Sequence, residues 1–123
     1  MESTLRGIED TLQRVLENQE MRLDDLKESI QSLEKSFNLL SQKWSLEILY
    51  TLFLKNVMGF NGLKKILAVN SRTLSNKLRS LEKHGYIQRT VDQGPPLRVK
   101  YSLTNRGRNI VLFALPLLYY SSS

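Results

Sequence analysis

A short segment of this 123-residue chain concentrates side chains that could bind the bases and phosphates of a nucleic acid. They recur every three or four positions, with two hydroxyl residues beside them: Arg72, Asn76, Arg79 and Lys83, then Thr73 and Ser80. In the major groove, Arg suits guanine, Asn suits adenine, and Thr suits either base or a thymine methyl group. Because residues at this spacing lie on one side of a helix, the pattern predicts a face that reads DNA.

A helix over residues 71–84 must position this face. Leu74, Leu78 and Leu81 fall within about 60° of one another at roughly 100° per residue, so we expect them to face the core while the polar set faces outward. Ser71 is the expected N-cap, and Gly85 is the small residue favoured just past a helix C-terminus. We interpret His84, in the last turn, as a surface residue favoured by the helix dipole rather than as a pH sensor.

We divide the candidate DNA contacts by the information they carry, because phosphate contacts fix position whereas base contacts fix sequence. The candidates for reading bases are Arg72, Thr73, Asn76 and Arg79. The candidates for the DNA backbone are Lys64, Lys65, Ser71, Ser75, Lys77, Lys83, Arg89, Arg98 and Lys100. The alternative is an ordinary solvated surface, which would intersperse Asp and Glu for i, i+4 pairs, yet Glu82 is the only acid in this helix. For Lys100, a charged edge strand that prevents aggregation is a further alternative.

The segments before this helix have the order of a helix-turn-helix. A core helix follows Ser41, a possible N-cap, and repeats apolar residues at helical spacing: Trp44, Ile48, Leu49, Leu52 and Phe53. A shorter helix comes next, with Asn61 as a possible cap and an apolar set of Phe60, Leu63, Ile66 and Leu67. The few residues from Ala68 to Asn70 join it to helix 71–84.

After Gly85 the apolar period changes to two. Residues 86–91 and 99–103 are rich in β-branched and aromatic residues and are separated by DQGPPLR, so a β-hairpin wing is predicted over 86–103. Thr104 is the expected N-cap of a last helix that reaches Tyr120, followed by a frayed SSS tail. The apolar run 110–120 has about half of the roughly 20 residues that a membrane-spanning helix needs, so we interpret it as a core or subunit contact.

The first forty residues predict a long helix with one apolar seam. Ten of eleven positions spaced by 3.5 residues on average are apolar: Leu5, Ile8, Leu12, Val15, Leu23, Leu26, Ile30, Leu33, Phe37 and Leu40. Gln19 breaks the seam and either fixes the register of a coiled coil or marks a frayed or bent point. A seam on a helix of about 50 Å needs a partner helix. The simplest partner is a second copy of the chain, in parallel or antiparallel pairing.

Charge divides the chain in the same place. Residues 1–40 hold five basic and nine acidic residues, a net charge of −4, whereas the rest holds thirteen basic and three acidic residues, a net charge of +10. This asymmetry predicts that the second part meets a polyanion and the first part meets protein. With no Cys and one His, no catalytic set, metal site or cofactor site is expected. The acidic N-terminus lacks an export signal, so we expect a cytoplasmic protein.

The second part resembles the HxlR-type winged helix-turn-helix regulators of the wider MarR-like group. The resemblance covers about residues 41–110 and is carried by QKWSLEILYTL, GFNGLKKIL, NSRTLSNKLRSLEKHGYIQRTV and PLRVKYSLTNRGR. It implies a dimeric transcription regulator, with the third helix of the domain in the major groove and the wing on flanking DNA. Two features depart from the family: the cysteine of its oxidant and aldehyde sensors is missing, and the N-terminal helix is longer than its usual dimerisation helix.

The sequence therefore predicts a mainly α protein with a small β-hairpin wing, a winged helix-turn-helix plus a long N-terminal helix. Residues 1–40 are the expected dimerisation helix, and residues 41–120 the expected DNA-binding domain, including the C-terminal helix. The predicted function is sequence-specific binding of double-stranded DNA by a homodimeric regulator that is not an enzyme. The alternatives are an architectural, chromatin-like protein that coats DNA, and a winged-helix protein-interaction module.

Overall fold

The computed structural model describes residues 2–18 and 23–122 of the chain, which divide into two compact units. One unit contains residues 41–113, and the other contains the described residues of 1–40 and 114–123. In the latter, the sequence predicted one long helix, whereas the described residues form two, α1 (Glu2–Asn18) and α2 (Leu23–Leu40). Gln19, the predicted break in the seam, lies outside the described residues.

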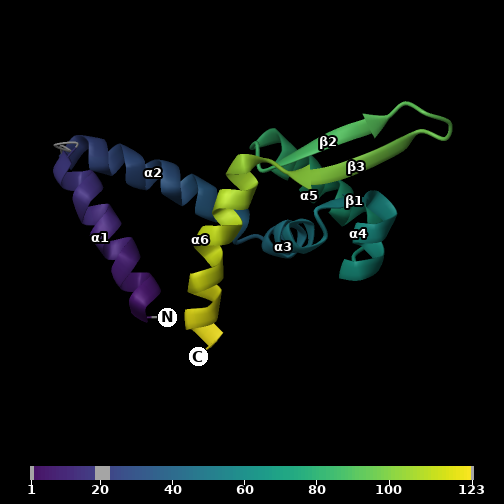
Figure 1. The fold of residues 1–123 in the computed structure, drawn as a ribbon. Helices are drawn as coiled ribbons and strands as arrows, with labels where there is room; N and C mark the ends of the chain where they lie inside the picture. The colour runs from purple at the N-terminus through teal and green to yellow at the C-terminus, as the bar shows by residue number, and fades with distance from the viewer. Residues whose placement is uncertain (1, 19–22, 123) are drawn as a thin grey trace. The chain divides into compact units, whose positions relative to one another are not determined.

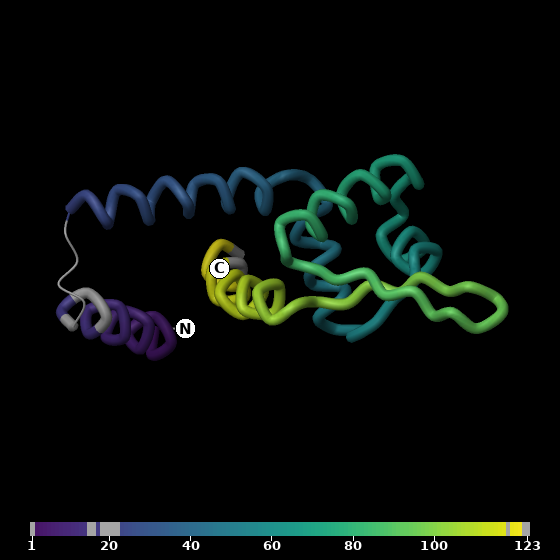
Figure 2. The backbone as a smooth tube through the Cα atoms, turned by 90° about the horizontal axis from the view of Figure 1, so that it is seen from above, coloured from purple at the N-terminus to yellow at the C-terminus, as the bar shows by residue number. Residues whose placement is uncertain are grey.

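The unit formed by residues 41–113 is a winged helix-turn-helix, as the sequence predicted (Figure 1). Its elements follow in the order α3 (Ser45–Lys55), β1 (Val57–Gly59), α4 (Phe60–Leu67), α5 (Ser71–Lys83), β2 (Ile87–Asp92) and β3 (Arg98–Leu103). The last helix, α6 (Asn105–Ser122), begins in this unit. The hairpin of β2 and β3 extends past α4 and α5 to a free tip, which makes it the wing (Figure 2).

A third strand that the sequence did not predict joins the hairpin. The sheet is antiparallel in the order β1-β3-β2, and β1 pairs with β3 from Val57 opposite Ser102 to Gly59 opposite Lys100. A strand of three residues is too short to show a period of two, and its partner is more than forty residues away in the chain. Because β3 is the central strand, the alternative that Lys100 guards a free sheet edge is wrong.

The core confirms the predicted inner face of α5. Leu74, Leu78 and Leu81 of α5 have only 0%, 2% and 0% of their surface exposed. The other buried residues of this core come from α3, α4, β2, α6 and the position before β2: Ile48, Leu49, Leu52, Leu63, Tyr86, Ile87 and Val111. Burying each such leucine contributes about 1.5–3 kcal/mol to folding, so the orientation of α5 is fixed by its apolar side.

Three helix starts differ from the predicted caps. The N-cap of α5 is Asn70, not Ser71, because the Asn70 Oδ1 accepts a hydrogen bond from the Thr73 backbone N–H at 2.8 Å. Helix α3 begins at Ser45 rather than beside Ser41, and the Glu47 carboxylate accepts from the Trp44 backbone N–H at 3.1 Å. Helix α4 begins one residue before Asn61, at Phe60.

The junction after α5 follows the prediction closely. Gly85 has φ +80°, and the N–H groups of Gly85 and Tyr86 bond to the carbonyls of Glu82 and Leu81, which is a Schellman motif. The predicted cap Thr104 also holds, since its Oγ1 accepts from the Gly107 N–H at 3.1 Å and donates to the Gly85 carbonyl.

The start and end of α6 show two further features. At Gly107 an added Cβ would lie 1.9 Å from the Tyr86 carbonyl oxygen, so only glycine lets α6 approach the backbone just before β2 this closely. The helix continues to Ser122, so the prediction of a frayed tail is wrong for Ser121 and Ser122. Within residues 2–18 and 23–122, no helix has the length and apolarity needed to cross a membrane.

Candidate nucleic-acid interface

One exposed face of α5 carries the predicted base-reading side chains. Arg72, Asn76 and Arg79 are exposed, together with Lys83. The leucines on the opposite side are buried, so these four side chains share the outward face of one helix. Thr73 is half-buried in the first turn, where its N–H bonds to Asn70. Four long or forked donors on one exposed helix suit the bases of a major groove.

Within the unit of residues 41–113, no carboxylate forms an ion pair with this face. Residues 41–113 contain three carboxylates, on Glu47, Glu82 and Asp92. Glu47 bonds to the Trp44 N–H at the start of α3, and no ion pair forms among the residues that the structure describes. The outward cations of α5 are therefore available to an external polyanion.

The helix residues predicted to contact the DNA backbone include both exposed and half-buried side chains. Lys64, Lys65 and Ser71 are exposed at the end of α4 and the start of α5. Lys77 is half-buried and donates from Nζ to the Gln42 Oε1 at 2.5 Å, which directs its ammonium group away from the outward face. Ser75 is half-buried and faces the wing.

The strand register separates the basic residues of the wing onto its two faces. Arg89 lies opposite Tyr101, whose ring is buried, so Arg89 is on the face of the hairpin that turns toward α5. Arg98 and Lys100 alternate with Val99 and Tyr101 along β3, so they lie on the other face. There they line a hollow with Gly59 of β1 and the first turn of α4, residues 60–62. The prediction grouped all three cations, and the sheet divides them.

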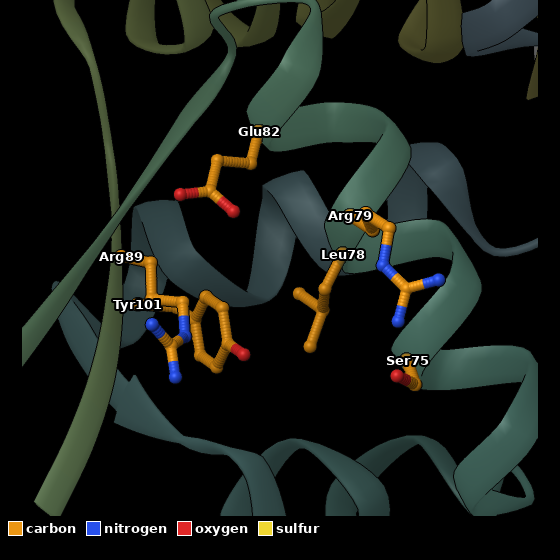
Figure 3. Close-up of a pocket in the computed structure, with 6 residues that line it drawn as sticks. All are labelled: Ser75, Leu78, Arg79, Glu82, Arg89 and Tyr101. Carbon is orange, nitrogen blue, oxygen red and sulfur yellow. The ribbon is translucent and has the colours of Figure 1, made fainter.

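A cavity of about 360 Å³ lies between α5 and the wing (Figure 3). It is lined by Ser75, Leu78, Arg79, Glu82, Arg89 and Tyr101. Figure 3 shows the Glu82 side chain reaching from α5 toward the strand that carries Arg89, and the Arg79 side chain extending beside Ser75. Glu82 and Tyr101 were not predicted as site residues. Their place beside Arg89 depends on the tertiary packing of the hairpin, although the lone acid of a basic helix was a visible signal.

One ionisable group of the same unit has a shifted pKa, and it lies outside this interface. The Tyr50 hydroxyl in α3 is buried, and it has no hydrogen-bond partner within the described chain. Burial raises the pKa of Tyr50, because the phenolate would lose its hydration. No group of His, Asp or Glu side chains in residues 2–18 and 23–122 is arranged to hold a metal ion.

Comparisons with known proteins agree with this architecture. The model of the family described as HxlR-like helix-turn-helix matches residues 39–119. The HTH-type transcriptional regulator YdzF of Bacillus subtilis (strain 168) is 35% identical over 78 residues, which cover 63% of this chain and 72% of YdzF. The HTH-type transcriptional regulator sll1512 of Synechocystis sp. is 42% identical over 80 residues, which cover 63% of this chain but only 59% of that protein.

A solved structure is similar over most of the chain. It is a transcriptional regulator of the MarR family from Enterococcus faecalis V583, with a TM-score of 0.70 and 26% sequence identity. The similar region covers 75% of this chain and 84% of the other. The similar region is therefore longer than the unit of residues 41–113 alone.

Proposed function

The chain belongs to the HxlR-like helix-turn-helix family, and from that premise we propose that it regulates transcription as a sequence-specific, homodimeric DNA-binding protein. It is a transcription regulator with a helix-turn-helix DNA-binding domain. The regulators that it resembles are not enzymes. Sequence preference, dimerisation and the individual DNA contacts are the content of the proposal.

In the proposed complex, the recognition helix, residues 71–84, enters the major groove of the duplex. A groove about 12 Å wide accepts an α-helix, and the side chains that point away from the core then meet the base edges. Arg72 and Arg79 pair with guanines, Asn76 pairs with adenine, and Thr73 contacts a base at the N-terminal end of the helix. The exposed polar face opposite the three buried leucines is the single observation that carries this assignment.

The remaining cations hold the phosphate backbones on both sides of that groove. Lys64 and Lys65 are exposed at the end of α4, and Lys83 is exposed at the end of α5. The wing, residues 86–103, lies along the flanking DNA and contributes Arg89 on one face, with Arg98 and Lys100 on the other. Because phosphate contacts release counterions, the logarithm of the affinity should fall steeply with the logarithm of the salt concentration.

Homodimerisation is supported by apolar side chains that the single chain leaves exposed. Leu23 is 80% exposed and Ile30 is 46% exposed on α2. They belong to the seam, whose other exposed members are Leu5, Leu12, Leu26, Leu33 and Phe37. The exposed seam residues of α2 recur every three or four positions and so share one helix face, and an exposed apolar face of this kind marks an interaction site. A second copy supplies the same seam, so a two-fold dimer covers both.

The last helix adds a second exposed apolar surface. Its exposed side chains include Leu112, Phe113, Leu115, Leu117, Tyr119 and Tyr120. We include this helix with the N-terminal helices in the dimer that joins two DNA-binding domains. Two domains held at a fixed distance favour paired half-sites separated by one helical turn of DNA or a multiple of it.

Selection of bound duplexes from a random pool tests this function. We expect enrichment of a motif with two related half-sites. A pool that stays random although the protein binds tightly would support the architectural alternative instead. A protein that binds no duplex even at low salt, yet retains a protein partner, would support the interaction-module alternative. We place the protein in the cytoplasm, where its operator DNA is accessible, and the absence of Cys excludes a thiol switch.

A further inference from the structure

The cavity between α5 and the wing holds three charged side chains that have no partner of their own. Arg79 and Glu82 come from α5 and Arg89 comes from β2. Within the part of the chain that the structure describes, no hydrogen bond or ion pair engages any of the three. Leu78 and Tyr101, both buried, form the apolar part of the lining. The lining is mainly polar, and the cavity volume of about 360 Å³ lies within the range of small-molecule sites, which start at about 300 Å³.

The lining carries two positive charges and one negative charge, and these charges indicate the chemical class of ligand that the cavity can bind. Two guanidinium groups offer paired N–H donors that suit a carboxylate. The Glu82 carboxylate accepts hydrogen bonds and repels anions, so it suits an ammonium group. We propose that the cavity binds a small amino carboxylate, with its carboxylate at Arg79 and Arg89 and its ammonium group at Glu82.

A phosphate of the DNA backbone fits this cavity less well. A phosphodiester has acceptor oxygens but no hydrogen-bond donor, so it leaves Glu82 unpaired and is repelled by it. An amino carboxylate satisfies all three side chains at once. The presence of Glu82 between the recognition helix and the wing therefore favours a small ligand over the nucleic acid at this point.

Arg79 couples the cavity to the DNA-binding face. At about 100° per residue, Ser75 and Glu82 point toward the wing, Arg72 and Asn76 point outward, and Arg79 lies between the two directions. A guanidinium group held on a ligand carboxylate is withdrawn from the major groove. Ligand and DNA then compete for Arg79, and the ligand lowers DNA affinity. This regulatory step rests on the proposed function, whereas ligand binding itself does not.

Ligand binding is tested first on the full-length protein without DNA. The probes are β-alanine and propionate, which share a carboxylate and differ in the ammonium group. Both are titrated at constant ionic strength, and amide chemical shifts of α5, β2 and β3 report binding. The wild type should bind β-alanine more tightly than propionate. Glu82→Gln should lower the affinity for β-alanine by about 2- to 5-fold, as expected for an exposed ion pair, and raise the affinity for propionate.

The matched control is Asp92→Asn, which also removes one negative charge but lies at the end of β2, outside the cavity lining. It should leave the preference for β-alanine unchanged. The proposal is overturned if neither probe shifts the cavity residues, or if both variants change the two affinities alike. Because Glu82 and Asp92 are exposed, neither substitution removes core contacts.

Competition with DNA is measured next, on a duplex obtained from the random pool. At equal ionic strength, β-alanine should weaken binding of the wild type more than it weakens binding of Glu82→Gln. An unchanged DNA affinity with the cavity occupied would overturn the regulatory step. If no duplex is selected but β-alanine still binds with the Glu82 dependence, the proposed function fails and the ligand site stands.

Discussion

Replacing Arg72 by Ala separates base reading from general electrostatic attraction. The side chain is exposed on α5, and the helix is held by buried leucines on its other side, so the substitution leaves the fold intact. A bidentate arginine–guanine pair contributes about 1–3 kcal/mol of discrimination, so affinity for the selected duplex should fall by roughly 5- to 150-fold. For random DNA, the loss should be limited to one cationic contact, which lowers the salt slope by about 0.9.

Lys64→Ala is the matched control for that experiment. Lys64 is also an exposed cation of the helix-turn-helix, but it lies on α4, where we assign it to a phosphate. Lys64→Ala should lower the affinity for the selected duplex and for random DNA by the same factor. Fluorescence anisotropy with both duplexes at several salt concentrations measures all four affinities. If Arg72→Ala and Lys64→Ala reduce the two affinities in the same proportion, Arg72 does not read a base.

Three further predictions follow from other parts of the molecule. Gly107→Ala should destabilise the domain by more than about 1 kcal/mol in urea unfolding, because its Cβ meets the Tyr86 carbonyl oxygen; full stability would refute that packing. Ile30→Glu should convert the proposed dimer to a folded monomer in sedimentation and weaken operator binding, whereas an unchanged mass would exclude this seam as the interface. The pKa of Tyr50 is raised in the folded protein, so folded Tyr50 keeps its proton near pH 10, where the unfolded chain begins to lose it. The stability that Tyr50 contributes is therefore fully present below that pH and is lost as the pH rises further. Tyr50→Phe should remove this part of the alkaline decline, and two parallel pH profiles of unfolding free energy would contradict the assignment.

Local patterns in the sequence were sufficient to predict the recognition helix and the wing. Three leucines at helical spacing determine which side of α5 is buried, and Gly85 marks where the helix ends. The hairpin agrees with the prediction to within one residue at the strand ends that face the loop, Asp92 and Arg98. These features depend on neighbouring residues, so periodicity and turn chemistry reveal them.

Features that depend on distant residues were not predicted. Strand β1 exists because Val57 and its two successors pair with β3, and three residues carry no period of their own. The start of α3 depends on Trp44 at φ 79°, a backbone conformation that no local pattern indicates for tryptophan. The cavity at Glu82 required the hairpin register, which places Arg89 and Tyr101 opposite each other.

The most direct test of base reading by α5 removes single acceptor atoms from the DNA. Each guanine of the selected duplex is replaced in turn by 7-deazaguanine, which lacks the major-groove N7 acceptor. We predict that at least one replacement lowers the affinity of the wild-type protein for the duplex. The same replacement should leave the affinity of either Arg72→Ala or Arg79→Ala unchanged. If no replacement weakens the wild type, or if both variants remain fully sensitive to every replacement, these arginines do not contact guanine in the major groove.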